Sequence, residues 1–264
     1  MSTSRADTIR RESLSELRQL AGWFRTKHGV TITLLGGWAV YSYNPYLGSF
    51  DIDCLGPRDP FTLHLNLYMK THGYVLEPES PVAATSESWR KYVYEGTTMI
   101  GYIEIDACDF EFRNSFKEDP SKEVPYTLCL DEKFVINRLI DGEYFWVPIK
   151  ELLFLYKIKS TRDRQYVLTH EDLTSEQLGY LVGKVSKDLS DLVALLDPRE
   201  EAMDGYILGN LIREYNLSFV TGTISNLPSQ PGAAGYSKGQ ADITDIRRWT
   251  EKILSDLQGE RKTL

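Results

Sequence analysis

Cysteine is scarce in this sequence of 264 residues, and its cysteines do not form a recognisable motif. Cys54, Cys108 and Cys129 are odd in number and widely spaced, with no Cys-x-x-Cys pair. This pattern argues against both a zinc knuckle and a disulfide framework. Because free thiols are typical of a reducing compartment, we expect a cytoplasmic protein.

Long apolar runs and an excess of positive charge are also missing. No stretch approaches the roughly 18 apolar residues that cross a membrane, and the first residues, MSTSRADTIRRES, lack the apolar run of a signal peptide. We therefore expect no membrane partner. The formal net charge is −8, whereas a surface devoted to nucleic acid is normally basic. A local basic groove on an acidic protein remains compatible with an RNA substrate, and abundant carboxylates suit the binding of divalent cations.

Hydrophobic periodicity divides the chain into a mixed first half and a helical second half. The pattern changes after Pro148, beyond which apolar residues recur at helical spacing. The predicted helices are 7–28, 38–43, 61–73, 149–159, 174–196, 200–216 and 242–257, the predicted strands are 31–35, 50–56, 89–94, 99–112, 134–140 and 144–148, and the predicted loops are 163–172 and 225–239. We expect an α/β (α+β) fold, with a short mixed β-sheet flanked by helices in domain 1–148 and a helical domain in 149–264.

Capping and turn residues mark several of these boundaries. Gly29 is placed to end the first helix, and Thr174 with Gln177 three residues later predicts a capping box at the start of another. Asp141 and Gly142 lie between two strand patterns, which predicts a β-hairpin.

The segment LLGGWAVYSYNPYLGSFDID combines features that suit phosphate and metal binding. Gly36 and Gly37 follow a predicted strand and precede a short helix, where backbone N–H groups attract anions. Asp51 and Asp53 lie two residues apart on the next strand, so their side chains point to the same face. Such a pair can hold Mg²⁺, which neutralises charge during phosphoryl transfer. The alternative is a turn followed by a solvated strand, on which two adjacent acids would repel each other.

These residues resemble the signature of the nucleotidyltransferase superfamily, which has a DNA polymerase β-like fold. That signature is a glycine pair, a spacer, and then Asp-x-Asp or Asp-x-Glu. GGWAV is also similar to the start of aminoglycoside and lincosamide nucleotidyltransferases, although Tyr46-Leu47-Gly48-Ser49-Phe50 replaces the Arg-x-x-His/Asn that those enzymes carry. The Ser-x-Asp-x-Asp form is more similar to the AbiEii-like toxins of AbiE-type toxin–antitoxin systems. The resemblance covers about residues 30–197.

The resemblance implies a third carboxylate on a neighbouring strand, which takes the proton of the attacking hydroxyl as general base. The segment YIEIDAC provides Asp106 and Glu104 on one strand face, and Asp106 matches the family pattern better. The implied metal ligands are Asp51, Asp53 and Asp106. They would bind two Mg²⁺ ions, with Mn²⁺ as an alternative.

The resemblance also assigns residues that hold the NTP. Gly36, Gly37 and Ser49 would bind its triphosphate, although a turn before the strand explains Ser49 nearly as well. VPIKELLFLYKIKS is similar to a family helix that presents a lysine to the triphosphate, and Lys157 is the matching residue. A solvated lysine is the alternative interpretation.

KDLSDLVALL resembles a further family segment, in which Asp188 and Asp191 lie one helical turn apart. They would orient the lysine, or bind the base or the metal, unless they form a surface ion pair. The stretch between Lys157 and this segment is longer than in the toxins, and residues 198–264 match no known pattern.

The expected activity is transfer of an NMP from an NTP to an acceptor hydroxyl. Three acceptors stay open: the 3′ end of an RNA such as tRNA, a small molecule such as an antibiotic, and a protein side chain. A toxin would also have a cognate antitoxin as a partner. The alternative from a different class is a non-catalytic nucleotide-binding module that has kept the fold.

Overall fold

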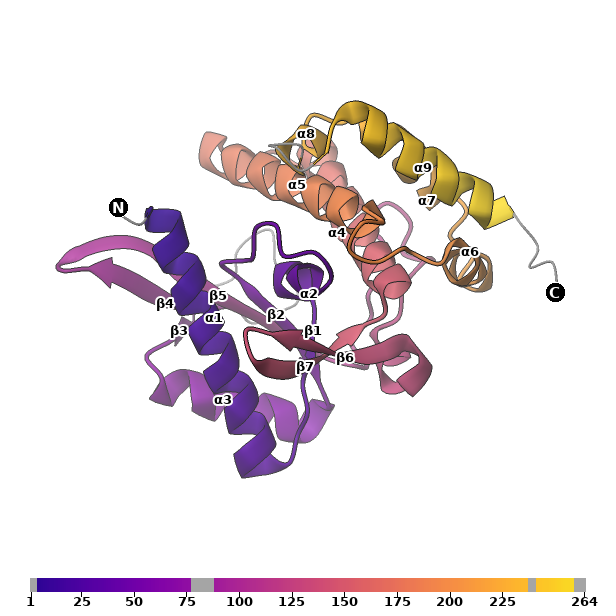
Figure 1. The fold of residues 1–264 in the computed structure, drawn as a ribbon. Coiled ribbons are helices and arrows are strands. Elements are labelled where there is room, and N and C mark those ends of the chain that lie inside the picture. Colours follow the sequence, from indigo (N-terminus) through magenta and orange to yellow (C-terminus); the bar gives the residue numbers. More distant parts are fainter. Residues whose placement is uncertain (1–3, 77–87, 237–240, 259–264) are drawn as a thin grey trace. The chain divides into compact units, whose positions relative to one another are not determined.

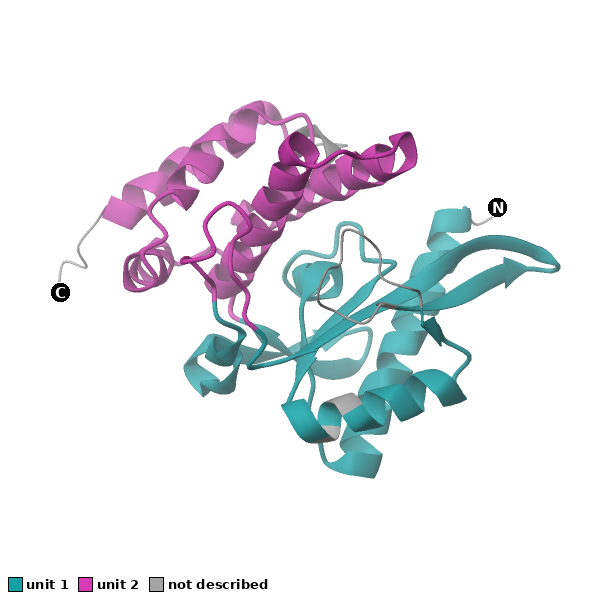
Figure 2. Cartoon of the chain, turned by 180° about the vertical axis from the view of Figure 1, so that it is seen from behind, with its two compact units in different colours: residues 1–112, 125–148 teal, residues 113–124, 149–264 magenta. Residues whose placement is uncertain are grey.

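The computed structural model describes residues 4–76, 88–236 and 241–258. It contains two compact units, which are coloured separately in Figure 2. Unit 1 comprises residues 1–112 and 125–148, and unit 2 comprises residues 113–124 and 149–264. The division after residue 148 coincides with the change in sequence pattern, but residues 113–124 group with the helical unit. The chain is a mixed α/β protein with a helical C-terminal region.

Unit 1 contains a mixed sheet with the strand order β3-β4-β5-β2-β1-β7-β6, which can be followed in Figure 1. The strands are β1 Thr33–Leu34, β2 Ile52–Gly56, β3 Val75–Leu76, β4 Ser88–Glu95, β5 Thr98–Asp109, β6 Val135–Ile140 and β7 Glu143–Pro148. β2 is parallel to β5 and β1 is parallel to β7, whereas the other neighbours are antiparallel. The sequence predicted these strands except β3, and β1 is shorter than its predicted range.

The predicted hairpin between β6 and β7 is confirmed. Its two turn residues both have positive φ, 47° at Asp141 and 89° at Gly142. This is the backbone of a type I′ turn, which matches the twist of the flanking strands and favours an Asp-Gly pair.

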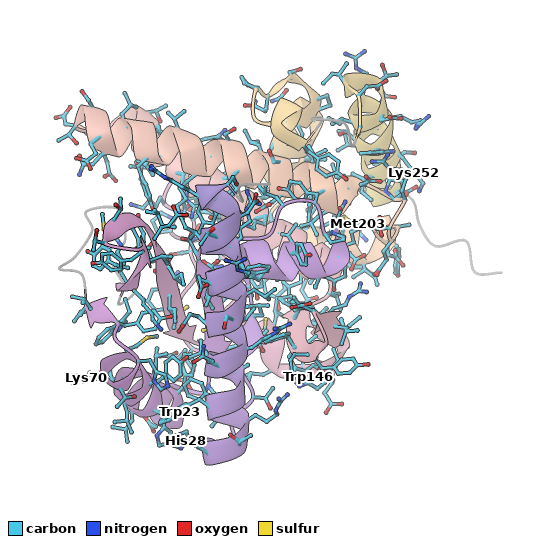
Figure 3. The ribbon with its side chains drawn as sticks, turned by 60° about the vertical axis from the view of Figure 1, so that its left-hand side comes forward. Trp23, His28, Lys70, Trp146, Met203 and Lys252 are labelled. Atoms are coloured by element: carbon cyan, nitrogen blue, oxygen red, sulfur yellow. The ribbon has the colours of Figure 1, made fainter. Side chains whose placement is uncertain are left out.

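The helices of unit 1 are α1 Arg5–Trp23, which continues as the π-helix Phe24–His28, α2 Gly36–Tyr43, α3 Arg58–Thr71, and the 3₁₀-helices Tyr126–Leu130 and Glu132–Phe134. α1 begins where the Ser4 hydroxyl accepts a hydrogen bond from the backbone N–H of Asp7. Gly29 ends the π-helix with a φ of 63°, as predicted. Figure 3 shows Trp23 and His28 near this end, where their ring centroids lie 5.6 Å apart.

Helices α1 and α3 cover one face of the sheet, called here the apolar face. A Cβ atom added to Gly101 of β5 would lie 2.5 Å from Cδ1 of Ile9 in α1. One added to Gly56 of β2 would lie 2.4 Å from the Phe61 ring in α3. Ile105, on the same face as Gly101, is fully buried. By strand alternation and register, the opposite, polar face carries Arg90, Tyr92 and Tyr94 of β4, Asp53 of β2, and Tyr102, Glu104 and Asp106 of β5.

Apart from the segment 113–124, unit 2 is a helical region. Its helices are α4 Lys150–His170, α5 Ser175–Leu196, α6 Gly205–Glu214, α7 Val220–Asn226, the 3₁₀-helix Leu227–Ser229, α8 Ala233–Tyr236 and α9 Ile243–Gln258. The predicted capping box at the start of α5 is confirmed, because the Thr174 hydroxyl accepts from the Gln177 N–H and the Gln177 side chain accepts from the Thr174 N–H.

Two predicted loops of unit 2 are wrong. Residues 163–172 mostly continue α4, because Val167 is buried and Asp163 pairs with Lys159 one turn earlier at 2.7 Å. Residues 225–236 contain helical turns, and Tyr236 is buried where its hydroxyl donates to Asp197. Polar composition was misleading in both segments because tertiary contacts stabilise the helices. Residues 237–239 of the second prediction lie outside the described ranges.

The segment 113–124 is attached to unit 2 by side-chain contacts that sequence pattern does not reveal. The Arg162 guanidinium of α4 donates to Glu118 at 2.7 Å, and the backbone N–H of Lys117 donates to Asp163 at 2.9 Å. Phe116 packs edge-on against Phe219, with 5.0 Å between ring centroids.

Across the described ranges, no helix combines the length and apolar character that a membrane crossing requires.

Candidate active site

Asp53 and Asp106 are neighbours on the polar face of the sheet. They are partners in the register of the parallel strands β2 and β5, between Ile52↔Ile105 and Cys54↔Ala107. Because paired residues of adjacent strands project to the same face and strands lie about 4.8 Å apart, the two side chains stand side by side. Both are half-buried. The sequence predicted these two residues but gave no information on their register.

Gly36 packs directly against Asp53. Gly36 has a φ of 61°, and a Cβ atom there would lie 1.7 Å from Oδ2 of Asp53. The residue before Gly36 is also bound to Asp53, since the backbone N–H of Leu35 donates a hydrogen bond to the carbonyl oxygen of Asp53 at 2.8 Å. Glycine is required here both for the left-handed backbone and for the space that the carboxylate occupies. Gly37 is buried in the first turn of α2.

The loop before Asp51 rests on α1 and α2. Gly48 has a φ of 76°, and a Cβ there would lie 3.2 Å from the Trp38 ring. The Trp38 indole N–H in turn donates to the buried Ser13 hydroxyl of α1 at 3.0 Å. Ser49 is buried, and the half-buried Asp51 lies in the bend before β2. Ser13 was not predicted as part of this arrangement, because a polar position in a helix carries no signal of its partner.

Glu104 and Asp106 differ in their surroundings although they share a strand face. Glu104 is buried and forms an ion pair with Arg90 at 2.8 Å. The Arg90 guanidinium also lies over the Tyr102 ring, 4.5 Å from its centroid. Asp106 instead faces Asp53 across the parallel pair. The structure therefore distinguishes the two carboxylates, because Glu104 is paired with Arg90 whereas Asp106 lies beside Asp53.

Cys54 lies under the two aspartates on the apolar side of β2. Burial raises the pKa of its thiol well above the usual value, and the nearby Cys108 and the carboxylates of Asp53 and Asp106 raise it further. Cys54 is therefore a neutral packing residue rather than a nucleophile.

The carboxylates supply only part of the predicted metal site. Within residues 4–76, 88–236 and 241–258, no three His, Cys, Asp or Glu side chains are grouped as a metal site. Asp51, Asp53 and Asp106 are therefore not grouped as a three-ligand cluster, and Asp51 lies in the bend before β2. The donor chemistry of Asp53 and Asp106 nevertheless fits Mg²⁺, which typically binds one or two carboxylates and takes its remaining ligands from water and substrate phosphates.

The second set of predicted residues gathers in unit 2. Nζ of Lys157 in α4 lies 3.1 Å from Asp188 Oδ1 and 2.7 Å from Asp191 Oδ2 in α5. Arg164 also pairs with Asp188, and Lys187 pairs with Asp191 at 3.0 Å. Lys157, Asp188 and Asp191 are all less than a tenth exposed. The two carboxylates therefore fix the position of the lysine, whereas neither a solvated lysine nor a surface ion pair describes them.

The structure thus brings the predicted residues together in two sets, one in each unit. Gly36, Gly37, Asp53 and Asp106 belong to unit 1, and Lys157 with its two aspartates belongs to unit 2. Arg90 and Arg164 were missed as members of these sets, because their partners Glu104 and Asp188 are distant in sequence. Lys187 was missed although its partner Asp191 lies one turn further along the same helix.

In comparisons with known proteins, no family model matches the chain and no curated protein sequence matches it. The nucleotidyltransferase resemblance therefore stays a prediction.

Proposed function

We propose that the chain is a Mg²⁺-dependent nucleotidyltransferase, which transfers an NMP from an NTP to an acceptor hydroxyl. The observation that carries this proposal is the in-register pair of Asp53 and Asp106 beside Gly36. Two half-buried carboxylates side by side provide oxygen ligands that one divalent cation can share. A glycine turn at the start of a helix provides backbone N–H groups for phosphate on the same side.

In the proposed reaction, the acceptor oxygen forms a bond to the α-phosphorus while the bond from that phosphorus to the pyrophosphate oxygen breaks. Asp106 takes the hydroxyl proton as general base. Asp51 and Asp53 bind the cation, which, when bound, neutralises the negative charge on the phosphate oxygens.

The triphosphate of the NTP has candidate binding groups in unit 1. The backbone at Gly36 and Gly37 and the Ser49 hydroxyl bind phosphate oxygens in this proposal. The resemblance also assigns Lys157 of unit 2 to the triphosphate, and its support is that Asp188 and Asp191 hold the ammonium group by ion pairs.

The test is incubation of the purified protein with each α-³²P-labelled NTP, Mg²⁺ and a cell extract. We expect Asp53→Asn to abolish labelling, while the exposed Asp59→Asn in the first turn of α3 leaves it unchanged. Thermal melting checks that both variants fold. Equal labelling by wild type and Asp53→Asn would reject the proposal.

The labelled product identifies the acceptor. Label in RNA, in tRNA above all, would support the toxin interpretation, and a cognate antitoxin should then suppress the activity. Label in a small molecule or in protein would support the other two acceptors. Saturable NTP binding without any transfer would instead support the non-catalytic nucleotide-binding module.

A further inference from the structure

A row of three tyrosines and a methionine, in which all but Tyr102 are exposed, leads away from the candidate active site along the polar face of the β4–β5 hairpin. Starting at Asp106, the cross-strand pairs are Ser88–Asp106, Arg90–Glu104, Tyr92–Tyr102 and, beyond a bulge, Tyr94–Met99. The row comprises Tyr92, Tyr94, Met99 and Tyr102, called here the tyrosine strip. Since a strand rises about 3.3 Å per residue, Tyr102 begins roughly 13 Å from Asp106.

Three side chains of the strip are exposed to solvent although they are large and mainly apolar. Tyr92 is 37% exposed, Tyr94 is 58% exposed and Met99 is 54% exposed. The other face of the same hairpin is covered, because Ile9 of α1 packs on Gly101 and Lys91 pairs with Glu16 of α1 at 2.6 Å. The aromatic residue of β4 on the covered face, Trp89, is buried, whereas Tyr92 and Tyr94 on the opposite face are exposed, and exposed aromatic side chains grouped on one face are typical of binding surfaces.

Two rings of the strip contact each other, and one contacts an arginine. The Tyr92 and Tyr102 rings meet edge to face with centroids 6.4 Å apart, and the Arg90 guanidinium lies over the Tyr102 ring, 4.5 Å from its centroid. Glu104 holds Arg90 in this position through their ion pair. Exposed tyrosine rings are surfaces on which other planar groups, including nucleobases, can stack.

We propose that the tyrosine strip binds the unpaired bases of a single-stranded nucleic acid and directs its terminal hydroxyl toward Asp106. This inference rests on the proposed nucleotidyltransferase activity, because it names the class of acceptor. The occupant is elongated, since the row is continuous with Asp53 and Asp106. It carries flat groups at intervals, since the strip offers ring faces rather than a row of hydrogen-bonding partners.

A protein partner is a different occupant of an exposed Tyr-, Met- and Arg-containing surface. The continuity with the two carboxylates favours the nucleic acid, because a transferase must align its acceptor with its reacting groups. A protein that merely docked on the hairpin would have no reason to follow the row to Asp106.

The test measures binding of fluorescein-labelled oligonucleotides of about 12 nucleotides by fluorescence anisotropy without NTP, using one single-stranded RNA, its DNA equivalent and the RNA duplex. We expect single strands to bind and the duplex to bind at least tenfold more weakly. Each of Tyr92→Ala and Tyr94→Ala should weaken binding roughly 5- to 100-fold, since loss of a stacked base costs about that factor. Tyr92→Trp should bind as the wild type does, because it keeps an aromatic ring at this position. The RNA and DNA arms show whether the sugar contributes.

The matched control is Tyr144→Ala, because Tyr144 is 63% exposed on the separate β6–β7 hairpin of the same unit. Unchanged binding by Tyr92→Ala and Tyr94→Ala, or an equal loss in Tyr144→Ala, would overturn the inference. Failure of the single strands to bind would overturn it as well and leave a protein partner as the occupant. Labelling by the active enzyme is measured separately. If Asp53→Asn loses transfer but the strip variants keep it in RNA, the strip is rejected and the proposed function stands.

Discussion

Gly36 and Asp53 occupy adjoining space, so that a single methyl group on the glycine would overlap the carboxylate. The Cβ position at Gly36 lies 1.7 Å from Asp53 Oδ2 and 2.4 Å from its Cγ. Gly36 also adopts a φ of 61°, which disfavours any side chain. The turn and the carboxylate therefore determine each other's position.

Gly36→Ala should be more damaging than the left-handed backbone alone explains. Gly29→Ala is the matched control, because Gly29 has a φ of 63° but open space around its Cβ position. We expect Gly29→Ala to cost about 1 kcal/mol of unfolding free energy, and Gly36→Ala to cost at least 2 kcal/mol more because Asp53 must move. Urea denaturation measures both. Equal losses would show that Asp53 does not pack on Gly36.

Glu104 and Asp106 should respond differently to neutral substitution. If Asp106 is the general base, Asp106→Asn should lower the rate of NMP transfer by about 10²- to 10⁴-fold. Glu104→Gln should lower it by less than about tenfold, but should destabilise the fold by about 1–3 kcal/mol, since it leaves the Arg90 charge without its carboxylate. Single-turnover assays and denaturation separate the effects. A larger loss of transfer rate in Glu104→Gln than in Asp106→Asn would show that Glu104, and not Asp106, is the general base.

Much of the fold follows from local pattern. The capping box at Thr174 and the Asp141-Gly142 turn rest on contacts between residues that are close in sequence, so the sequence predicts them well. Residues 163–170 were mistaken for a loop because their polar side chains find partners only in the folded protein, such as Asp163 with Lys117 of a distant segment.

The candidate site was predictable in its residue types but not in its pairing. The Asp-x-Asp pattern identifies Asp53, yet nothing in the sequence states that β5 lies parallel to β2 with Asp106 opposite it. The family pattern prefers Asp106 to Glu104, but it does not predict the ion pair of Glu104 with Arg90, which is fourteen residues away in the chain. Register and ion pairing are tertiary properties, so sequence pattern alone leaves them open.

Lys157 should be essential to the stability of unit 2 as well as to any role in phosphate binding. Lys157→Met removes the cation that Asp188 and Asp191 share but leaves their pairs with Arg164 and Lys187, so it should cost about 1–3 kcal/mol. Lys159→Met, two residues along α4, removes a more exposed pair with Asp163 and should cost at most about 1 kcal/mol. Chemical denaturation compares the two. Similar small losses would mean that the buried cluster does not hold Lys157 in place.

The hydroxyl of Tyr236 should make the stability of unit 2 depend on pH. Burial of the Asp197 carboxyl opposes its charge, but hydrogen bonds from Arg199 and from Tyr236, the latter 2.5 Å long, outweigh it and hold the pKa of Asp197 below its ordinary value of 3.8. A carboxyl whose pKa is lowered by folding stabilises the fold at pH values above its ordinary pKa. This contribution is lost as the pH falls through the lowered pKa.

Tyr236→Phe removes one hydrogen-bond donor to Asp197, so it should lower the free energy of unfolding by about 1–3 kcal/mol at pH 7. The difference from wild type should shrink below about pH 4, where the carboxylate is being protonated. Tyr180→Phe, at an exposed tyrosine of α5, should have little effect at either pH. Denaturation of the three proteins across this range decides the matter, and a loss in Tyr236→Phe that stays constant with pH would assign the effect to packing instead of the charged hydrogen bond.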